Sequence, residues 1–480
     1  MGALMIRRID PYRIEIAKQP PMRTTGLVYA NSKIERSLED DNVFQQVANV
    51  AMLPGIVGPS FAMPDIHWGY GFPIGGVAAF SEKDGIISPG GVGYDINCGV
   101  CCISTRLKLD EVSPRIDRLL ASLFNNVPAG VGSRNKGLAV GSKEFGQVLT
   151  KGAQWAVRKG YAPDEDLDAH EDKGCIDGAD PDAVSKKAIE RGLPQLGTLG
   201  SGNHFLELDV VDMILNRVIA ERLGLFEGQV VILVHTGSRG LGHQICDDYV
   251  HAMVSVASRY GIELPDRQLA CAPVKSREGQ EYFGAMACAA NFAFANRELI
   301  TFLVRETFEE FFGKSYEHLG MRLLYDCCHN IAKMERIIWG GSEVKVCIHR
   351  KGATRALPPG DKRLPDRFAL TGQPVLVPGD MGRMSYILTG SQGASETFYS
   401  ACHGAGRLLS RHEAKKRSKG RDVIRELHDR GIHAMAASRS TMAEEIPDAY
   451  KDVSDVVDTI TGAGIATAVA RLKPVAMIKG

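Results

Sequence analysis

Pro89-Gly-Gly-Val-Gly-Tyr-Asp-Ile-Asn-Cys-Gly99 surrounds one carboxylate, Asp95, and one thiol, Cys98, with four glycines. Glycine adopts positive φ readily and lets a backbone approach a ligand closely, so this density predicts a loop shaped around a bound group. The three-residue spacing allows a turn to direct both side chains at one ion. Two interpretations stay open for this stretch alone: a metal site, or an Asx turn beside a small buried cysteine.

The composition is that of an ordinary globular protein with no formal net charge. The chain has 480 residues, of which 44% are hydrophobic and 24% are charged, enough for a large core. Lys plus Arg and Asp plus Glu both number 57. A global basic field is therefore excluded, and a nucleic acid would have to be bound through local basic patches.

The eleven cysteines indicate a reducing compartment. They include the vicinal pairs Cys101-Cys102 and Cys327-Cys328, unlike the disulfide framework of a small secreted domain. The N-terminus has no long apolar core after its charges, and no 18-residue apolar run occurs later. We expect a soluble, cytoplasmic protein without a membrane partner.

Short apolar strands alternate along the chain with helical runs and glycine-rich loops. We expect strands at 205–211 and 229–234, and helices near 114–124, 241–260, 286–312 and 440–471. The pattern is typical of a mixed α/β (α+β) fold, and the lack of a Pro/Ser-rich linker favours one large domain over residues 1–480. The acidic stretch 162–182 is broken by Pro and Gly and is expected to be a surface excursion.

Three histidines next to strand-like runs extend the first motif. They are His204, His235 and His329, and together with Asp95 and Cys98 they predict a metal site, although each histidine alone is better explained as a satisfied core or surface residue. Thiolate and imidazole favour Zn²⁺ or Fe²⁺, whereas carboxylate and phosphate oxygens favour Mn²⁺ or Mg²⁺, so the ligands leave the metal open. One thiolate can also bridge two ions, as in two-metal phosphoryl chemistry.

A second candidate site lies at His403-Gly-Ala-Gly-Arg407. We expect an amphipathic helix with a basic outer face after Gly406, whose first turn would offer N–H groups to a phosphate. A neutral His403 could attack a nucleotide α-phosphate while the amides of Gly404, Ala405 and Gly406 hold the developing charge. A histidine that merely caps a helix is the alternative. No Walker A motif occurs in the sequence.

Basic and aromatic side chains in the same loops complete the set. Arg and Lys within glycine-rich loops are candidates for phosphate contacts, and here they are Arg191, Arg239, Lys351 and Arg411. The stretch Asp65-Ile-His-Trp-Gly-Tyr-Gly-Phe72 adds aromatic rings, and Trp68 is expected to fill the core rather than to stack on a base.

With these residues assembled, the chain resembles the RtcB family of GTP- and manganese-dependent RNA ligases over essentially its whole length. The resemblance implies the RtcB-type fold, a single domain with a central β core surrounded by helices. The matching motifs are Pro64-Asp-Ile-His-Trp-Gly69, Gly90-Gly-Val-Gly-Tyr-Asp-Ile-Asn-Cys-Gly99, Gly200-Ser-Gly-Asn-His-Phe205, His235-Thr-Gly-Ser-Arg-Gly240, Cys328-His-Asn330, His349-Arg-Lys-Gly352, Pro378-Gly-Asp-Met-Gly382 and His403-Gly-Ala-Gly-Arg407.

By this resemblance, each chain would bind two Mn²⁺ ions and GTP. One ion would be held by Asp95, Cys98 and His204, and the other by Cys98, His235 and His329. His403 matches the nucleophile that takes GMP from GTP. The implied guanylate pocket consists of Asn203, His204, Phe205, Leu206, Glu207, His329, Asn330, Pro378, Gly379, Asp380, Met381, Ser385, His403, Gly404, Ala405, Gly406, Tyr450 and Lys479, and the implied RNA contacts are Arg191, Arg239, Lys351 and Arg411.

The implied reaction joins RNA 2′,3′-cyclic phosphate or 3′-phosphate ends to 5′-hydroxyl ends, in tRNA splicing or RNA repair. The partners would be such RNA ends, with tRNA halves as the expected source, and the resemblance leaves room for an activating protein of the archease type. Two alternatives remain: a dinuclear-metal phosphoesterase acting on RNA cyclic phosphates, and a non-catalytic RNA-binding protein with a structural metal. The chain departs from the family's pattern at Cys101, where an Arg is common, and at Asp380, where Ser or Thr is frequent.

Overall fold

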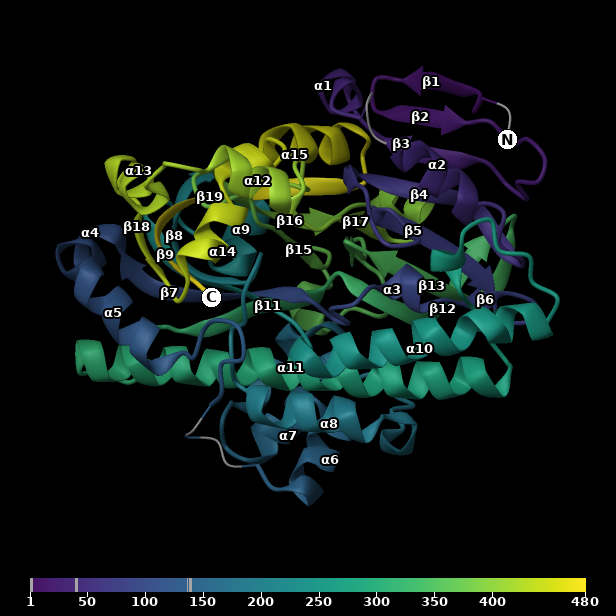
Figure 1. The fold of residues 1–480 in the computed structure, drawn as a ribbon. Coiled ribbons are helices and arrows are strands. Elements are labelled where there is room, and N and C mark those ends of the chain that lie inside the picture. Colours follow the sequence, from purple (N-terminus) through teal and green to yellow (C-terminus); the bar gives the residue numbers. More distant parts are fainter. Residues whose placement is uncertain (1–2, 39–41, 136, 138–139) are drawn as a thin grey trace.

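Two large β-sheets form the centre of the molecule, with helices packed around them (Figure 1). The computed structural model describes residues 3–38, 42–135, 137 and 140–480. Within these residues the first sheet has the strand order β1 (Ile6–Asp10), β2 (Arg13–Ile16), β3 (Gly26–Tyr29), β4 (Ile56–His67), β5 (Ile74–Ser81), β13 (Ser342–Lys351) and β12 (Asn330–Trp339).

The second sheet carries most of the predicted metal ligands at its strand ends. Its order is β11 (Arg322–Cys328), β7 (Gly99–Lys108), β9 (Gln229–Thr236), β8 (Phe205–Ile214), β19 (Ala466–Lys479), β16 (Ser385–Gly390) and β15 (Pro374–Val377), with β18 (His433–Ala436) parallel to β19. Two short ribbons pair β6 (Ile86–Ile87) with β10 (Ala272–Pro273) and β14 (Ala353–Arg355) with β17 (Ser400–Cys402).

Fifteen α-helices lie within the described residues. They are α1 (Ser32–Arg36), α2 (Val43–Val50), α3 (Pro89–Val92), α4 (Leu109–Val112), α5 (Ile116–Asn126), α6 (Ser142–Lys151), α7 (Ala153–Arg158), α8 (Lys186–Gly192), α9 (Arg217–Leu223), α10 (Arg239–Arg259), α11 (Arg277–Phe312), α12 (Arg411–Arg417), α13 (Val423–Asp429), α14 (Arg439–Glu444) and α15 (Val453–Gly462).

The register of the second sheet brings distant residues to one edge. Thr236 at the end of β9 lies opposite Gly99 at the start of β7, and Gly99 also lies opposite Cys328 at the end of β11. His235 on β9 lies opposite Phe205, the first residue of β8. Because these strands are antiparallel neighbours, the residues just outside their ends meet on the same side of the sheet.

Helix α11 supports this edge from below. It runs under the strands across the width of the molecule, with α10 alongside it and α6 to α8 on its outer side (Figure 1). Its middle, residues 284–301, is buried on every side and rich in alanine. A helix that is buried all round belongs to the interior, and small side chains allow neighbouring backbones to approach it closely.

Most of the expected elements are confirmed, and one is wrong. The strands at 205–211 and 229–234 and three of the four helical runs correspond to β8, β9, α5, α10 and α11. The expected helix at 440–471 is instead two short helices, α14 and α15, followed by strand β19. Gly464, with φ of +76°, ends the helical course, and the segment after it pairs with β8 and β16.

The acidic stretch 162–182 is not simply a surface excursion. Asp166, His170 and Glu171 are buried, and each pairs with a charged residue of the interior. His170 Nε2 lies 2.5 Å from Glu298 on α11, and its Nδ1 lies 2.9 Å from Asp326 on β11. Burial alone would lower the pKa of His170, but these two carboxylates raise it to about 10. The segment therefore anchors α11 to the sheet.

No helix in the described parts of the chain combines the length and apolar composition needed to cross a bilayer.

Candidate active site

A cavity of about 680 Å³ opens where the two sheets meet. His329 lies between β11 of one sheet and β12 of the other, and His403 follows β17. Both line the cavity together with Asp95, Cys98 and His235. Side chains more than 300 residues apart in the sequence therefore face one cavity, as expected for a ligand or catalytic site.

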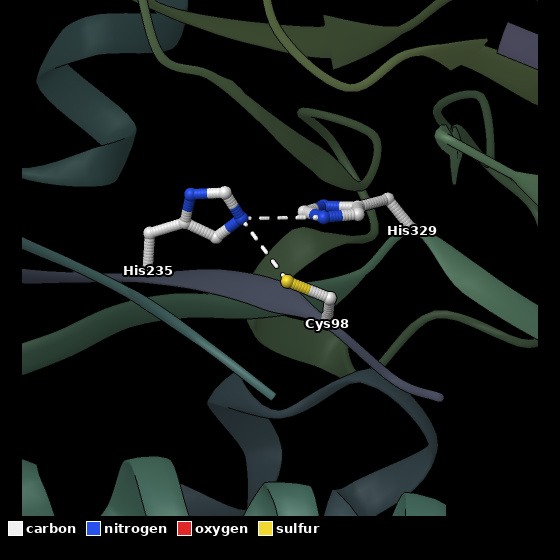
Figure 2. A group of neighbouring side chains, drawn as sticks. All are labelled: Cys98, His235 and His329. Carbon is white, nitrogen blue, oxygen red and sulfur yellow. Dashed lines mark hydrogen bonds between the residues drawn. The ribbon is translucent and has the colours of Figure 1, made fainter. Parts of the chain in front are cut away.

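The five predicted metal ligands form two groups that share Cys98. The first is Asp95, Cys98 and His204, and the second is Cys98, His235 and His329. His204 Nε2 lies 2.8 Å from Asp95 Oδ2 and 3.4 Å from Cys98 Sγ. Figure 2 shows that His235 Nε2 points at both other members of its group, 3.3 Å from Cys98 Sγ and 3.3 Å from His329 Nε2.

These distances suit metal binding. Ligand atoms that each lie about 2.0–2.3 Å from one tetrahedral ion are separated by roughly 3.3–3.7 Å. Two imidazole nitrogens at this distance repel each other through their lone pairs unless a cation or a proton lies between them. The two donor sets of nitrogen, sulfur and carboxylate oxygen therefore fit two divalent ions that share one thiolate. The donor types alone do not select a metal.

Two of the candidate ligands are neutral imidazoles that are ready to coordinate, whereas the thiol must first lose its proton. Burial raises the pKa of the Cys98 thiol well above its usual value, and the charge of Asp95 raises it further. Burial lowers the pKa of His235 and of His329 well below the usual value, so both rings are neutral and able to coordinate. A divalent cation would replace the thiol proton, and binding would release that proton to solvent.

Buried contacts fix the turn that carries Cys98. Asn97 adopts a left-handed conformation with φ of 52°, and its backbone N–H donates to the carbonyl of Asn330 at 2.7 Å. Arg297 on α11 is completely buried and donates to the Asn97 carbonyl at 2.8 Å and to the Thr236 carbonyl at 3.0 Å. One guanidinium thus connects the Cys98 turn to the strand end that carries His235.

A glycine beside Asp95 leads to a mutational prediction. A Cβ at Gly237 would lie 2.6 Å from Asp95 Oδ1, closer than real Cβ contacts allow. We expect Gly237→Ala to displace the Asp95 carboxylate and to weaken the binding of a divalent cation by the candidate ligands about 10-fold or more, by analogy with lost contacts to metal ligands. Calorimetric titration with Mn²⁺ checks this; Gly146→Ala, where a Cβ meets nothing within 4 Å, is the control. Equal affinities of the two variants would contradict it.

His403 is held by a carboxylate that sequence reasoning missed. Its Nδ1 donates to Asp65 Oδ2 at 2.5 Å, and its backbone N–H donates to the same oxygen at 2.8 Å. Asp65 is fully buried. The neighbour needed to fix the proton of His403 is therefore Asp65, 338 residues earlier in the chain. The only sequence signal was its place at the start of the Asp65–Phe72 motif.

The expected helix after Gly406 begins later than predicted. Helix α12 starts at Arg411, with Ser410 as its N-cap, and residues 403–410 form a loop. The amide of Gly404 donates to Asp65 Oδ2 at 3.3 Å, and that of Ala405 donates to the Pro378 carbonyl at 3.1 Å. These two N–H groups therefore have acceptors within the protein, and the predicted contact of the 404–406 amides with a phosphate stays a prediction.

Most of the expected guanylate residues line the same cavity. They are Asn203, His204, Phe205, Glu207, His329, Asn330, Pro378, Gly379, Asp380, Met381, His403, Gly404, Ala405, Gly406, Tyr450 and Lys479. Two expected residues do not line it. Leu206 is buried in the core, and the Ser385 hydroxyl accepts a hydrogen bond from the Gly379 N–H at 3.1 Å, so Ser385 supports the loop from behind.

Comparison with known proteins identifies the family. The sequence model described as tRNA-splicing ligase RtcB matches residues 46–480. The chain is 53% identical over 477 residues to a protein of Thermococcus kodakarensis with that name, covering 99% of both chains. It is 49% identical over 479 residues to a protein of Archaeoglobus fulgidus with the same name, again covering 99% of both. The chain belongs to the RtcB family.

The two departures from the RtcB pattern have different surroundings. Cys101 is buried in β7, and its Sγ lies 3.8 Å from the Thr301 hydroxyl of α11, so it does not line the cavity. Asp380 does line it, and burial raises the pKa of this carboxyl to about 6. Its Oδ1 accepts from the Gly382 N–H at 2.9 Å, and Arg383 lies 3.1 Å from Oδ2.

Three of the four cations expected to contact RNA in this RtcB family member line the cavity, and one of these three, Lys351, is bound by carbonyls of the protein itself. Arg239 and Arg411 line the cavity. Arg191 does not, and its guanidinium donates to Gln244 at 2.9 Å. Lys351 lines it, yet its ammonium donates to the carbonyls of Phe72 at 3.1 Å and Gly90 at 3.0 Å, and also to that of Tyr70. All three donors of Lys351 are used within the protein.

Proposed function

We propose that the chain is an RNA ligase that joins 2′,3′-cyclic phosphate or 3′-phosphate ends to 5′-hydroxyl ends, through GMP carried on His403. Membership of the RtcB family supports the ligase activity and its place in tRNA splicing, and we extend it to RNA repair. The observation that carries the guanylyl transfer is the pair of His403 and Asp65 beside two cation sites in one cavity.

Asp65 prepares His403 for attack. Because Nδ1 donates its proton to Asp65, the opposite ring nitrogen, Nε2, keeps its lone pair. Nε2 would form a bond to the α-phosphorus of GTP while the bond from that phosphorus to the pyrophosphate oxygen breaks. The positive charge that develops on the ring lies against the Asp65 carboxylate, which stabilises it in a buried setting.

The two groups of ligands would hold two Mn²⁺ ions, one on Asp95, Cys98 and His204 and the other on Cys98, His235 and His329. When bound, such ions neutralise phosphate charge and lower the pKa of a coordinated hydroxyl. The rings of His329 and His403 lie 4.8 Å apart between centroids, so the nucleophile is next to the second group. The protein thus places the attacking nitrogen and the cation sites on the same side of the cavity.

Carboxylates in the cavity suit guanine. Guanine presents N1–H and N2–H donors along one edge, where adenine has an acceptor. Glu207 and Asp380 are buried carboxyl groups that line the cavity and provide acceptors. Burial lowers the pKa of Lys479, and its ammonium lies 5.3 Å from the Phe205 ring centroid at the same wall. This group of residues would prefer GTP over ATP.

The RNA ends would enter after guanylylation. Water would first open the cyclic phosphate, breaking its bond to the 2′-oxygen and leaving a 3′-phosphate. An oxygen of that phosphate would then take GMP as the bond between His403 Nε2 and phosphorus breaks, and the 5′-hydroxyl would attack the 3′-phosphorus and expel GMP. Arg239 and Arg411 line the cavity and would neutralise backbone phosphates without reading sequence. An activating protein of the archease type is a further partner that we propose for repeated turnover.

Retention of labelled GMP on the protein tests this proposal. With α-labelled GTP and Mn²⁺, the wild type should keep acid-labile label after denaturation, because GMP is bonded to the His403 ring. His403→Ala should lose at least about 10³-fold of this label, since it has no nucleophile. His412→Ala, an exposed histidine on α12, is the matched control and should label normally.

Two other results would count against the ligase. No label on the wild type with any divalent metal would refute the histidine–GMP step. Hydrolysis of an RNA cyclic phosphate without label would favour the dinuclear phosphoesterase, which has no use for the bond between Asp65 and His403.

A further inference from the structure

One large aromatic side chain stands exposed at the mouth of the catalytic cavity. Trp68 lines that cavity with 51% of its surface accessible, whereas Trp155 is 2% accessible. The expectation that Trp68 fills the core is therefore wrong. An indole of this size loses favourable burial when it faces water, so its exposure at a binding site calls for a ligand that covers it.

The loop that presents Trp68 is held firmly from below. Gln46, which is buried, donates to the carbonyls of Gly69 at 2.5 Å and Gly71 at 3.2 Å and accepts from the Gly69 N–H at 3.1 Å. Gln268 accepts from the Gly71 N–H at 2.9 Å. The ammonium of Lys351 donates to the next carbonyls of the loop, those of Tyr70 and Phe72. The backbone that follows Trp68 is thus fixed, while the indole itself remains open.

Three further rings line the same cavity as Trp68. The rings of Tyr70 and Tyr94 lie 5.6 Å apart between centroids in an edge-to-face arrangement, and those of Tyr94 and His243 lie 5.9 Å apart. All three line the cavity and keep part of their surface accessible. We call Trp68, Tyr70, Tyr94 and His243 the aromatic rim.

We propose that the aromatic rim binds unpaired nucleobases of the RNA ends by stacking, with Trp68 as its main platform. The inference rests on the proposed ligase function, which requires single-stranded ends in this cavity. Single-stranded RNA is bound by combining phosphate contacts with stacking on aromatic faces, and both components are present here: Arg239 and Arg411 line the cavity with the rim. The loop's fixed backbone lowers the entropy lost on binding.

Lys351 gains a role from the same arrangement. It is a positioning residue that holds the Trp68 loop against the Gly90 turn through three carbonyls. It would therefore affect RNA binding without touching a phosphate.

Tryptophan fluorescence gives a direct test, because the chain has only three tryptophans. Short RNAs with a 3′-phosphate or a 5′-hydroxyl are titrated into the Mn²⁺-loaded protein without GTP. RNA should quench the wild type and Trp339→Phe but leave Trp68→Phe unquenched. Trp339 is the matched control, since it is 37% accessible and stacks on Phe398 away from the cavity. Equal quenching of wild type and Trp68→Phe would overturn the proposal.

A second measurement uses RNA that lacks one terminal base. Trp68→Ala should raise the KM for intact RNA about 10-fold while GMP adduct formation continues, because the change removes one stacked base. Two RNAs are compared, one abasic at its 3′-phosphate end and one abasic at its 5′-hydroxyl end. The RNA that lacks the stacked base should bind wild type and Trp68→Ala equally, and this result identifies the stacked strand. If both abasic RNAs keep the full difference between the two proteins, the stacking assignment is wrong. Quenching of Trp68 without any GMP adduct would instead refute the ligase mechanism but support binding of nucleobases by the aromatic rim.

Discussion

Asp65→Ala should slow formation of the GMP adduct on His403 by about 10³-fold or more, whereas Asp65→Asn should slow it by about 10- to 100-fold. Asp65 Oδ2 accepts three N–H groups: Nδ1 of His403 and the backbone amides of His403 and Gly404. Alanine removes the acceptor that fixes the His403 tautomer, together with the negative charge. Asparagine removes only the charge.

The backbone amides decide how asparagine would sit at position 65. Two N–H groups point at the Oδ2 position, so the amide oxygen of asparagine must occupy it, because an NH₂ group there would face two donors. The other carboxylate oxygen, Oδ1, has no hydrogen-bond partner among the described residues, so no donor opposes an NH₂ group at that position. His403 would then keep its proton on Nδ1, and the remaining loss reports the charge alone.

Rapid-quench measurement of adduct formation with labelled GTP gives both rates. Mn²⁺ binding is the control, because Asp65 is not among the metal ligands, and both variants should bind it as the wild type does. Equal rates for Asp65→Ala and wild type would show that His403 does not need this carboxylate. Lower activity of the asparagine variant than of the alanine variant would show that the amide is reversed.

The cluster of candidate metal ligands was predictable because each member has a local signature. Cys98, His204, His235 and His329 all lie at the ends of strands or in glycine-rich turns, where the sequence pattern changes from apolar to polar. Strand register then needs only antiparallel pairing to bring them together. Polar residues at strand ends are a signal that can be read locally.

The partners of these residues had no such signature. Asp65 and His403 meet across 338 residues, and nothing near either one indicates the other. The expectation for the acidic stretch 162–182 failed for a related reason. Charged residues are usually exposed, yet Glu171 is buried, with its Oε1 2.5 Å from Lys333 Nζ of β12. Non-local ion pairs neutralise charges that composition alone assigns to the surface. Trp68 shows the opposite error. Its aromatic character predicts burial, but it is exposed because it lines the cavity.

Arg297→Met should abolish most Mn²⁺ binding through contacts that lie behind the ligands. Arg297 on α11 is completely buried, and its guanidinium donates hydrogen bonds to the carbonyls of Asn97 and Thr236 and to the carboxylate of Asp326. Its loss frees the Cys98 turn from the strand end that carries His235, and it leaves Asp326 without this partner in the interior. We expect a loss of about 10- to 100-fold in Mn²⁺ affinity and about 3–5 kcal/mol in the free energy of unfolding.

Arg305→Met separates the two effects. Arg305 lies on the same helix, is 3% accessible and forms an ion pair with Asp166 at 2.5 Å, but it contacts none of the metal ligands. Both variants should lose comparable stability in thermal unfolding, because each removes the guanidinium that pairs with a buried carboxylate, Asp326 in one case and Asp166 in the other. Only Arg297→Met should lose Mn²⁺ affinity, measured by calorimetry at a temperature where both remain folded. Wild-type affinity in Arg297→Met would mean that the Cys98 turn keeps its shape without the guanidinium, and equal losses in both variants would mean that α11 supports the site only through overall stability.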